Sequence, residues 1–334
     1  MNIPISILDL APVVTGSNSA QALRNTISLA EHADRLGYSR FWVAEHHAMP
    51  GIASSAPAVL VGEIASRTPR IQVGSGGVML QNHRPFVVAE QFGTLEALHP
   101  GRVDLGVGKN SGIEPAAVKA LGLSGAQQST EEFVRAVDEL RRYFDDESIA
   151  VPAAGNRPRM WMLGASGRSA KLAGLLGLRF AYAHHINPTE TVAALAAYRA
   201  TFRPSRDFTK PHALITAPVI CAESEEEARN LAKPGALAFL RMRNIKPGAE
   251  PHNFLPAPLD VEKHIYSHEE SEVVERYFAT QVIGNPEQVR KNLEELLSET
   301  QADELMMTAM VHDHHDLIRS YELIADTLPM SAYK

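Results

Sequence analysis

Short apolar runs alternate with longer amphipathic stretches along most of the chain. Eight runs of four to ten residues are rich in Val, Ile, Leu, Met and aromatic residues, and they cover positions 3–8, 40–45, 71–80, 102–107, 160–163, 179–183, 213–221 and 304–310. Because these runs are apolar almost throughout, each one indicates a strand that is buried on both faces. The pattern therefore predicts eight strands of a parallel sheet.

The stretches between the runs carry the sequence signals of helices. Leu23, Ile27 and Leu36 lie on one helical face, and Gly37 follows as a residue suited to the end of a helix. Further helix starts are marked by Pro57, Pro85, Ser129 with Glu132, Asn187-Pro188, Asn285-Pro286 with Gln288, and Asp313. The sequence thus predicts a helix after each strand.

Eight strands, each followed by a helix, predict one closed (β/α)8 (TIM) barrel that spans residues 1–334 as a single domain. The alternative is a doubly wound open sheet, but eight is the number of strands that closes such a barrel. Two connections are longer than the others, 110–128 after the fourth strand and 244–280 after the seventh. Long loops in compact domains are usually functional or disordered. We therefore expect 244–280 to be an insertion that acts as a lid, with a solvated insertion as the alternative.

Composition and charge narrow the class of protein. The 334 residues carry a net charge of −7 and no run of Lys or Arg, so we expect no nucleic-acid partner. The single cysteine, Cys221, excludes an intramolecular disulfide and favours a reducing compartment. No apolar run reaches the roughly 18 residues that cross a bilayer, and the first residues lack the basic start of a signal peptide. We therefore expect a cytoplasmic protein without a membrane partner.

Reactive side chains of a (β/α)8 barrel lie at the carboxyl ends of its strands. The most concentrated group there is Glu45-His46-His47 after the second strand, while Gln81-Asn82-His83-Arg84 follows the third strand and Lys109 the fourth. Histidines exchange protons near neutral pH. Because neighbouring strand residues point to opposite faces, at most one of His46 and His47 faces the pocket squarely. The alternative is that both are structural histidines.

Five stretches follow one another in a recognisable order along the chain. They are Phe41-Trp42-Val43-Ala44-Glu45-His46-His47 at the second strand, and then positions 73–80, 88–92, 100–108 and 302–306. In this order they resemble the bacterial-luciferase-like monooxygenases, and the resemblance extends from Ile3 to about Leu328. It implies an enzyme that uses reduced FMN and O2. It also implies that His46 acts in proton transfer at the reduced flavin, with Glu45 and His47 as its support.

The same resemblance suggests where the flavin binds. It implies a non-proline cis peptide bond at Gly76–Gly77 beside the flavin ring, whereas close backbone packing alone is the other interpretation of these glycines. It also implies a phosphate site at the start of a helix, formed by Ser166, Gly167, Arg168 and Ser169. Lys109 would lie nearby and compensate the negative charge of the phosphate. The start of a helix offers free N–H groups to an anion, although plain capping by Ser166 would leave the same pattern.

The leading hypothesis is an FMN-dependent monooxygenase that incorporates molecular oxygen into a small, aldehyde- or ketone-like organic substrate. The glycines around Gly106 and Gly108 lack the spacing of a Rossmann unit for a nicotinamide cofactor, so we expect a separate flavin reductase to supply reduced FMN. The alternatives are an F420-dependent hydride-transfer oxidoreductase of the same fold and a flavin-binding protein without turnover.

A metal-dependent hydrolase is a competing class of barrel enzyme. Such sites usually need two ligands, two residues apart, near the first strand. The first strand contains Ile7-Leu8-Asp9-Leu10, which offers no such pair, so we expect no metal. The family resemblance additionally implies a homodimer.

Overall fold

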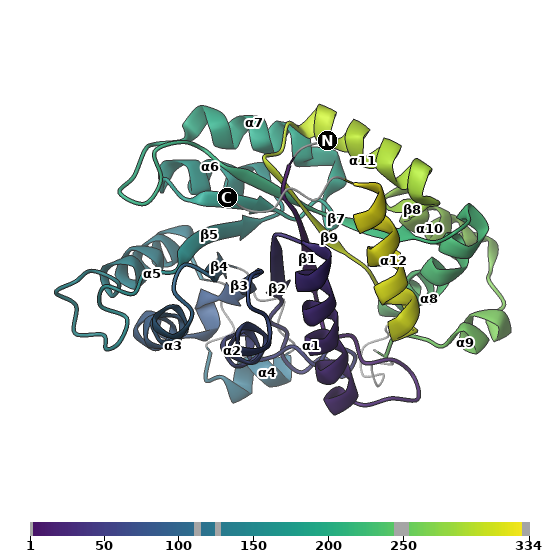
Figure 1. The fold of residues 1–334 in the computed structure, drawn as a ribbon, viewed down its shortest axis with the longest axis horizontal. Helices are drawn as coiled ribbons and strands as arrows, with labels where there is room; N and C mark the ends of the chain where they lie inside the picture. The colour runs from purple at the N-terminus through teal and green to yellow at the C-terminus, as the bar shows by residue number, and fades with distance from the viewer. Residues whose placement is uncertain (1–2, 110–114, 124–127, 244–253, 329–334) are drawn as a thin grey trace.

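The computed structural model describes residues 3–109, 115–123, 128–243 and 254–328, and its strands belong to one parallel sheet. The strands run in the order β6-β5-β4-β3-β2-β1-β9-β7, and β6 also pairs with β7, so that eight strands close into a barrel (Figure 1). The predicted closed barrel is therefore confirmed, and the open sheet is wrong. The barrel strands are β1 Ile5–Asp9, β2 Arg40–Val43, β3 Gln72–Met79, β4 Val103–Gly108, β5 Arg159–Gly164, β6 Arg179–Tyr182, β7 Ala213–Cys221 and β9 Glu304–Thr308.

Each of the eight predicted runs overlaps one barrel strand. A further short strand, β8 (Val282–Gly284), pairs only with the end of β7, at Val219–Cys221, and lies outside the closed ring. Three residues are too few to give a periodic pattern, which is why the sequence analysis did not predict β8.

Helices surround the strands on the outside of the barrel (Figure 1). The main ones are α1 Ser19–Leu36, α2 Pro57–Arg67, α3 Pro85–Leu98, α5 Thr130–Arg142, α6 Gly167–Leu175, α7 Thr191–Thr201, α8 Glu225–Arg243, α11 Pro286–Thr300 and α12 His314–Thr327. The shorter elements are η1 Leu80–Asn82, α4 Pro115–Ala120, η2 Pro188–Glu190 and α9 Pro258–Lys263, and a further helix, α10 His268–Ala279, precedes β8. None of the helices within the described ranges is both long and apolar enough to cross a membrane.

Most of the predicted helix ends have the expected hydrogen bonds. Gly37 ends α1 in the left-handed conformation, with φ 86°, which a residue without a Cβ adopts without strain. Capping boxes begin α5 at Ser129 and α11 at Asn285, and Asp313 accepts two backbone N–H groups at the start of α12. These caps satisfy N–H groups that have no partner inside the helix.

The predicted helical start at Asn187-Pro188 is confirmed in position, but Asn187 makes no side-chain capping bond. A 3-10 turn, η2, follows Asn187, and α7 begins only at Thr191, without a capping bond from Asn187. The side chain of Asn187 instead donates to the carbonyl of Ala165 and accepts from the hydroxyl of Thr189. A tertiary contact with the loop after β5 has therefore replaced the local capping bond.

The amino end of the barrel is closed by buried charges that the sequence analysis did not predict. Arg40, at the start of β2, is fully buried and donates to Asp104 of β4 and Glu304 of β9, at 2.7 Å in each case. Asp104 also accepts from the indole N–H groups of Trp42 and Trp161, at 3.0 and 3.3 Å. Because each charge has partners, the network is tolerated in a buried environment.

The predicted lid, 244–280, lies partly outside the described residues, which resume at Phe254. The described part contains α9 and α10. Leu255 exchanges backbone hydrogen bonds with Val13 and Thr15, which follow β1 at its carboxyl end. The segment is thus attached to the same end of the barrel as the predicted site, and its role as a lid stays a prediction. The other long connection, 110–128, contains α4, and residues 110–114 and 124–127 are outside the described ranges.

Candidate active site

His46 lies at the barrel mouth, just beyond the end of β2. The side chains of Trp42 and Ala44 belong to the apolar cluster inside the barrel, together with Leu8, Trp161, Ala181, Leu214 and Met306. His46 follows this strand three residues beyond its end and is half-buried. Its backbone N–H donates to the carbonyl of Ser54, at 2.9 Å, which holds the segment just beyond the end of β2.

Nδ1 of the His46 imidazole is buried and has no hydrogen-bond partner among the described residues. Burial lowers the pKa of His46 below its ordinary value; the negative charge of Glu45 opposes this shift, and His47 adds to it. A buried polar atom without a partner carries a free-energy cost. His46 is therefore a neutral imidazole with a nitrogen that a bound molecule could engage.

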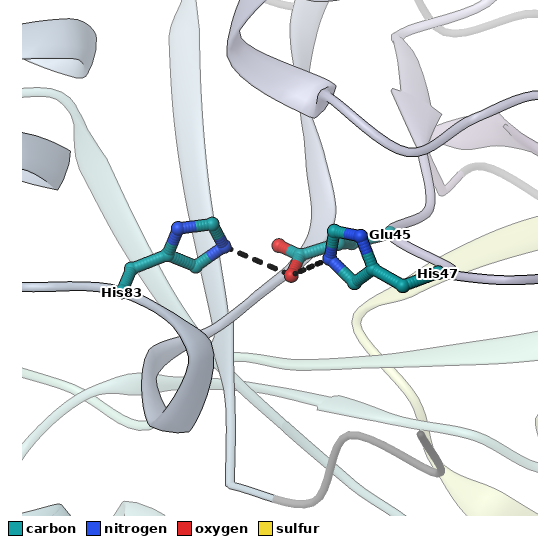
Figure 2. Close-up of side chains that lie close together, drawn as sticks. All are labelled: Glu45, His47 and His83. Atoms are coloured by element: carbon teal, nitrogen blue, oxygen red, sulfur yellow. Dashed lines mark hydrogen bonds and ion pairs between the residues drawn. The ribbon is translucent and has the colours of Figure 1, made fainter. Parts of the chain in front are cut away.

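Glu45 lies next to His46 and points in another direction, toward the turn that follows β3. Its Oε1 accepts from Nε2 of His47 at 2.8 Å, from Nε2 of His83 at 2.9 Å and from Nδ2 of Asn82 at 2.9 Å. Its Oε2 accepts from the backbone N–H of Met79 at 3.1 Å. Figure 2 shows the carboxylate between the two imidazoles. Four donors on one carboxylate connect the end of β2 to β3 and η1.

These contacts also fix the charge of Glu45, which is only 3% exposed. Burial by itself raises the pKa of Glu45. The hydrogen bonds from His83, Asn82 and His47, with the charge interaction with His83, outweigh burial, so the pKa lies below its usual value. Glu45 is therefore ionised at neutral pH.

The Gly76–Gly77 peptide bond is cis, as the family resemblance implied. The two glycines lie at a register shift between β3 and β4, two residues before the Glu45 partner Met79. A Cβ on Gly77 would lie 2.6 Å from the carbonyl oxygen of Gly106, and one on Gly76 would lie 2.8 Å from Leu8 Cδ1. Close packing alone thus requires glycine at Gly77, where the obstacle is backbone, whereas at Gly76 the obstacle is the end of a Leu side chain that can move.

The predicted phosphate site lies at the start of α6. Ser166 and Ser169 form a capping box, so the plain capping role is present. A Cβ on Gly167 would meet no atom within 4 Å, which shows open space beside its N–H. That N–H has a long contact of 3.4 Å with Oε2 of Glu190, an exposed carboxylate that an incoming anion would have to displace. Arg168 is exposed beside it.

Lys109 follows β4, and its Nζ is 3.4 Å from the hydroxyl of Thr130 at the start of α5. β4 and β5 are neighbouring strands, so Lys109 and the start of α6 follow adjacent barrel strands at the same end. The structure thus places all the predicted site residues at one end of the barrel. Direct hydrogen bonds join Glu45 to His47, while His46 is separate from them.

Asn82 and His83 are two further residues of the site. Their sequence positions predict that they lie at the barrel mouth, but not that they belong to the group around Glu45. Both are half-buried and bind Glu45 from the end of β3. Position at the end of a neighbouring strand was the available signal. That position does not specify that Asn82 and His83 contact Glu45, because the contact depends on the path of η1.

Comparison with known proteins extends this description. The model of the luciferase-like monooxygenase family matches residues 3–304. An Escherichia coli K12 protein described as a luciferase-like monooxygenase is 40% identical over 331 residues, which cover 97% of this chain and 96% of the relative. The N-acetyl-S-alkylcysteine monooxygenase of Bacillus subtilis is 38% identical over 237 residues, covering 68% and 70%. The solved structure of apo-MsnO8 has a TM-score of 0.88 at 37% identity and covers 97% and 98%.

More distant structures share the fold but carry different cofactors. The oxygenating constituent of 3,6-diketocamphane monooxygenase from a Pseudomonas putida plasmid, in complex with FMN, has a TM-score of 0.74 at 19% identity, covering 97% of each chain. An F420-dependent secondary alcohol dehydrogenase has a TM-score of 0.70 at 15% identity, covering 99% of each chain. At these identities the likeness concerns the fold alone.

Proposed function

Because the chain belongs to the luciferase-like monooxygenase family, we propose that it is a flavin-dependent monooxygenase that uses reduced FMN and O2. It oxygenates a small organic substrate of the aldehyde or ketone type. The observation that carries the proposal is the unpartnered, buried Nδ1 of His46 at the barrel mouth. In its neutral state this nitrogen can accept or return a proton next to a bound cofactor.

The described residues fit a flavin in part. The open space beside Gly167 and the free end of α6 suit a phosphate, with Ser166, Arg168 and Ser169 around it. Lys109 would attract the phosphate through the single charge of its ammonium group, whereas an arginine there could form two parallel hydrogen bonds. Glu190 opposes an anion, but its exposed side chain can turn toward solvent.

Bound FMN would supply the oxygen chemistry, and the protein would supply orientation and proton control. The backbone of Gly76 and Gly77 would support the flavin ring. His46 would hold or move a proton at Nδ1. Glu45 and His47 would support His46 by fixing the segment from which it projects. Segment 244–280 would cover the mouth and exclude water.

The remaining expectations belong to the same proposal. A separate flavin reductase supplies reduced FMN, and the enzyme works in the cytoplasm. A homodimer belongs to the proposal through the family resemblance, and exposed apolar side chains that could take part in its interface include Val59 on α2 and Val87 and Leu98 on the adjacent α3. Apolar surface of this kind often marks an interface. Light scattering on the purified protein measures the mass of the assembly.

The test is turnover with chemically reduced FMN, O2 and a panel of small aldehydes, ketones and thioethers, followed by mass spectrometry of the products. Oxygen-18 incorporation from O2 into one substrate class supports the proposal. His46→Ala should lower the rate of oxygenation by roughly 10²–10⁴-fold. His315→Ala is the matched control, because the side chain of that histidine is 93% exposed near the start of α12.

Two results would contradict the proposal. Oxidation of substrates by F420 with no incorporation of oxygen would indicate the hydride-transfer class. Tight binding of FMN without turnover, unchanged in His46→Ala, would indicate a flavin-binding protein.

A further inference from the structure

Three side chains with metal-binding atoms converge at the ends of β2 and β3. Glu45, His47 and His83 each offer one such atom, and these atoms all lie within 4.8 Å of one another. Both imidazoles direct Nε2 at the same carboxylate oxygen of Glu45 (Figure 2). We propose that this cluster binds one divalent cation of the zinc class, in a site separate from the nitrogen of His46.

The ligand set matches the chemistry of such an ion. Imidazole nitrogen and carboxylate oxygen are ligands of Zn²⁺, and two histidines with one carboxylate leave a fourth position for water. Ligand atoms lie at about 2.0–2.2 Å from such an ion. Nε2 of each imidazole is now 2.8 or 2.9 Å from Glu45 Oε1, so each ring would move slightly away from the carboxylate to admit the ion between them. Side-chain exposures of 20% for His47 and 29% for His83 leave room for that movement and a route for the ion.

Charge favours the same conclusion. The Glu45 side chain is fully buried, and its Oε1 has three nitrogen partners, which are Nε2 of His47, Nε2 of His83 and Nδ2 of Asn82. A divalent ion would take the Nε2 lone pairs while the ring protons move to Nδ1. The bound ion would then place a positive charge directly on a carboxylate that is buried away from water.

Asn82 provides a separate observation. Its Nδ2 donates to Glu45 Oε1, while its Oδ1 is buried and has no hydrogen-bond partner in the described part of the chain. A water molecule on the ion could donate to this oxygen. Neighbours of this kind orient metal ligands, and their loss typically lowers metal affinity about 10–100-fold.

The sequence did not predict this site because the expectation of no metal concerned the first strand. Glu45 and His83 are 38 positions apart and meet only when β2 and β3 pair. The short Glu45-His47 spacing supplies two ligands, which are too few to indicate a metal.

The experiment is a Zn²⁺ titration of the full-length, flavin-free and chelator-treated protein by calorimetry. We expect one ion per chain. His47→Ala and His83→Ala should each lower the affinity by more than the roughly 10–100-fold expected for Asn82→Ala. His46→Ala is the matched control, since it removes the adjacent histidine outside the cluster, and it should bind Zn²⁺ within about twofold of the wild type.

A second measurement separates loss of the site from loss of folding. Co²⁺ bound to nitrogen and oxygen ligands in a low-symmetry site absorbs visible light through d–d transitions. We expect this absorption in the wild type and in His46→Ala, but not in His83→Ala. Zn²⁺ should also raise the thermal midpoint of the wild type and leave that of folded His83→Ala unchanged. Because flavin is absent throughout, these results do not depend on the proposed monooxygenase activity.

Three outcomes would overturn the proposal. They are no saturable binding to the wild type, binding that His47→Ala and His83→Ala retain, and binding that His46→Ala loses equally. In each case the cluster would be a hydrogen-bond network alone.

Discussion

The imidazole of His83 donates to the carboxylate of Glu45 over 2.9 Å, and this contact joins the turn after β3 to the end of β2. His46 is the residue after Glu45, and Gly76–Gly77 lies shortly before the Glu45 partner Met79. The buried carboxylate therefore fixes the position of the mouth histidine relative to the glycine segment.

Glu45→Gln should lower the free energy of unfolding by about 1–3 kcal/mol in metal-free protein, because the amide nitrogen leaves at least one buried donor without an acceptor. Urea unfolding measures the change. Glu63→Gln is the control, since the exposed carboxylate of Glu63 forms only a surface pair with Arg67, and that loss should stay below about 1 kcal/mol. Equal losses of unfolding free energy in the two variants would show that the contacts of Glu45 stabilise the protein no more than a surface ion pair does.

Acid should affect His46 only below the ordinary histidine pKa of about 6.5, because burial lowers the pKa of His46 in the folded protein. The unfolded chain takes up this proton first, so the stability from neutral His46 is fully present above the ordinary value and is lost as the pH falls from there through the lower pKa of the folded protein. We expect the acid limb of turnover, measured with reduced FMN in excess, to have its midpoint below that value. An NMR titration of His46 with a midpoint at or above it would refute the prediction.

Gly77→Ala should destabilise the protein by about 1–3 kcal/mol, because its Cβ would lie 2.6 Å from the carbonyl oxygen of Gly106. Gly167→Ala is the matched substitution into open space at the start of α6, and it should leave thermal stability nearly unchanged. The same methyl group would obstruct the proposed phosphate position, so FMN affinity should fall. Unchanged FMN affinity in folded Gly167→Ala would place the phosphate elsewhere.

Arg40→Met should lower the free energy of unfolding by about 3–5 kcal/mol, because it leaves the buried carboxylates of Asp104 and Glu304 without their shared cation. Chemical unfolding measures the loss. Arg67→Met, on the exposed surface, is the control and should cost no more than about 1 kcal/mol. A loss of similar size in both variants would show that the buried network stabilises no more than a surface pair.

The same network predicts acid sensitivity. Burial raises the pKa of Glu304, but Arg40 and His212 outweigh burial and lower it to about 2. Stability from the Glu304 carboxylate is therefore present above its ordinary pKa and is lost as the pH falls toward about 2. Arg40→Met should weaken this dependence in unfolding measured across the acid range.

The sequence by itself determined the eight barrel strands and most helix ends of this protein. Both depend on local periodicity and on capping residues only a few positions apart, such as Ser129 with Glu132. Position after a strand likewise placed Glu45, His46 and His47 at the barrel mouth, because every strand of a (β/α)8 barrel ends there.

Only the tertiary structure decided which side chains meet. The Glu45–His83 contact, the Arg40 network and the bond from Asn187 to Ala165 join residues from different elements. No local pattern encodes such pairs, because they depend on strand register and on the path of each loop. The closing of the barrel turned separate polar residues into a connected cluster beside His46.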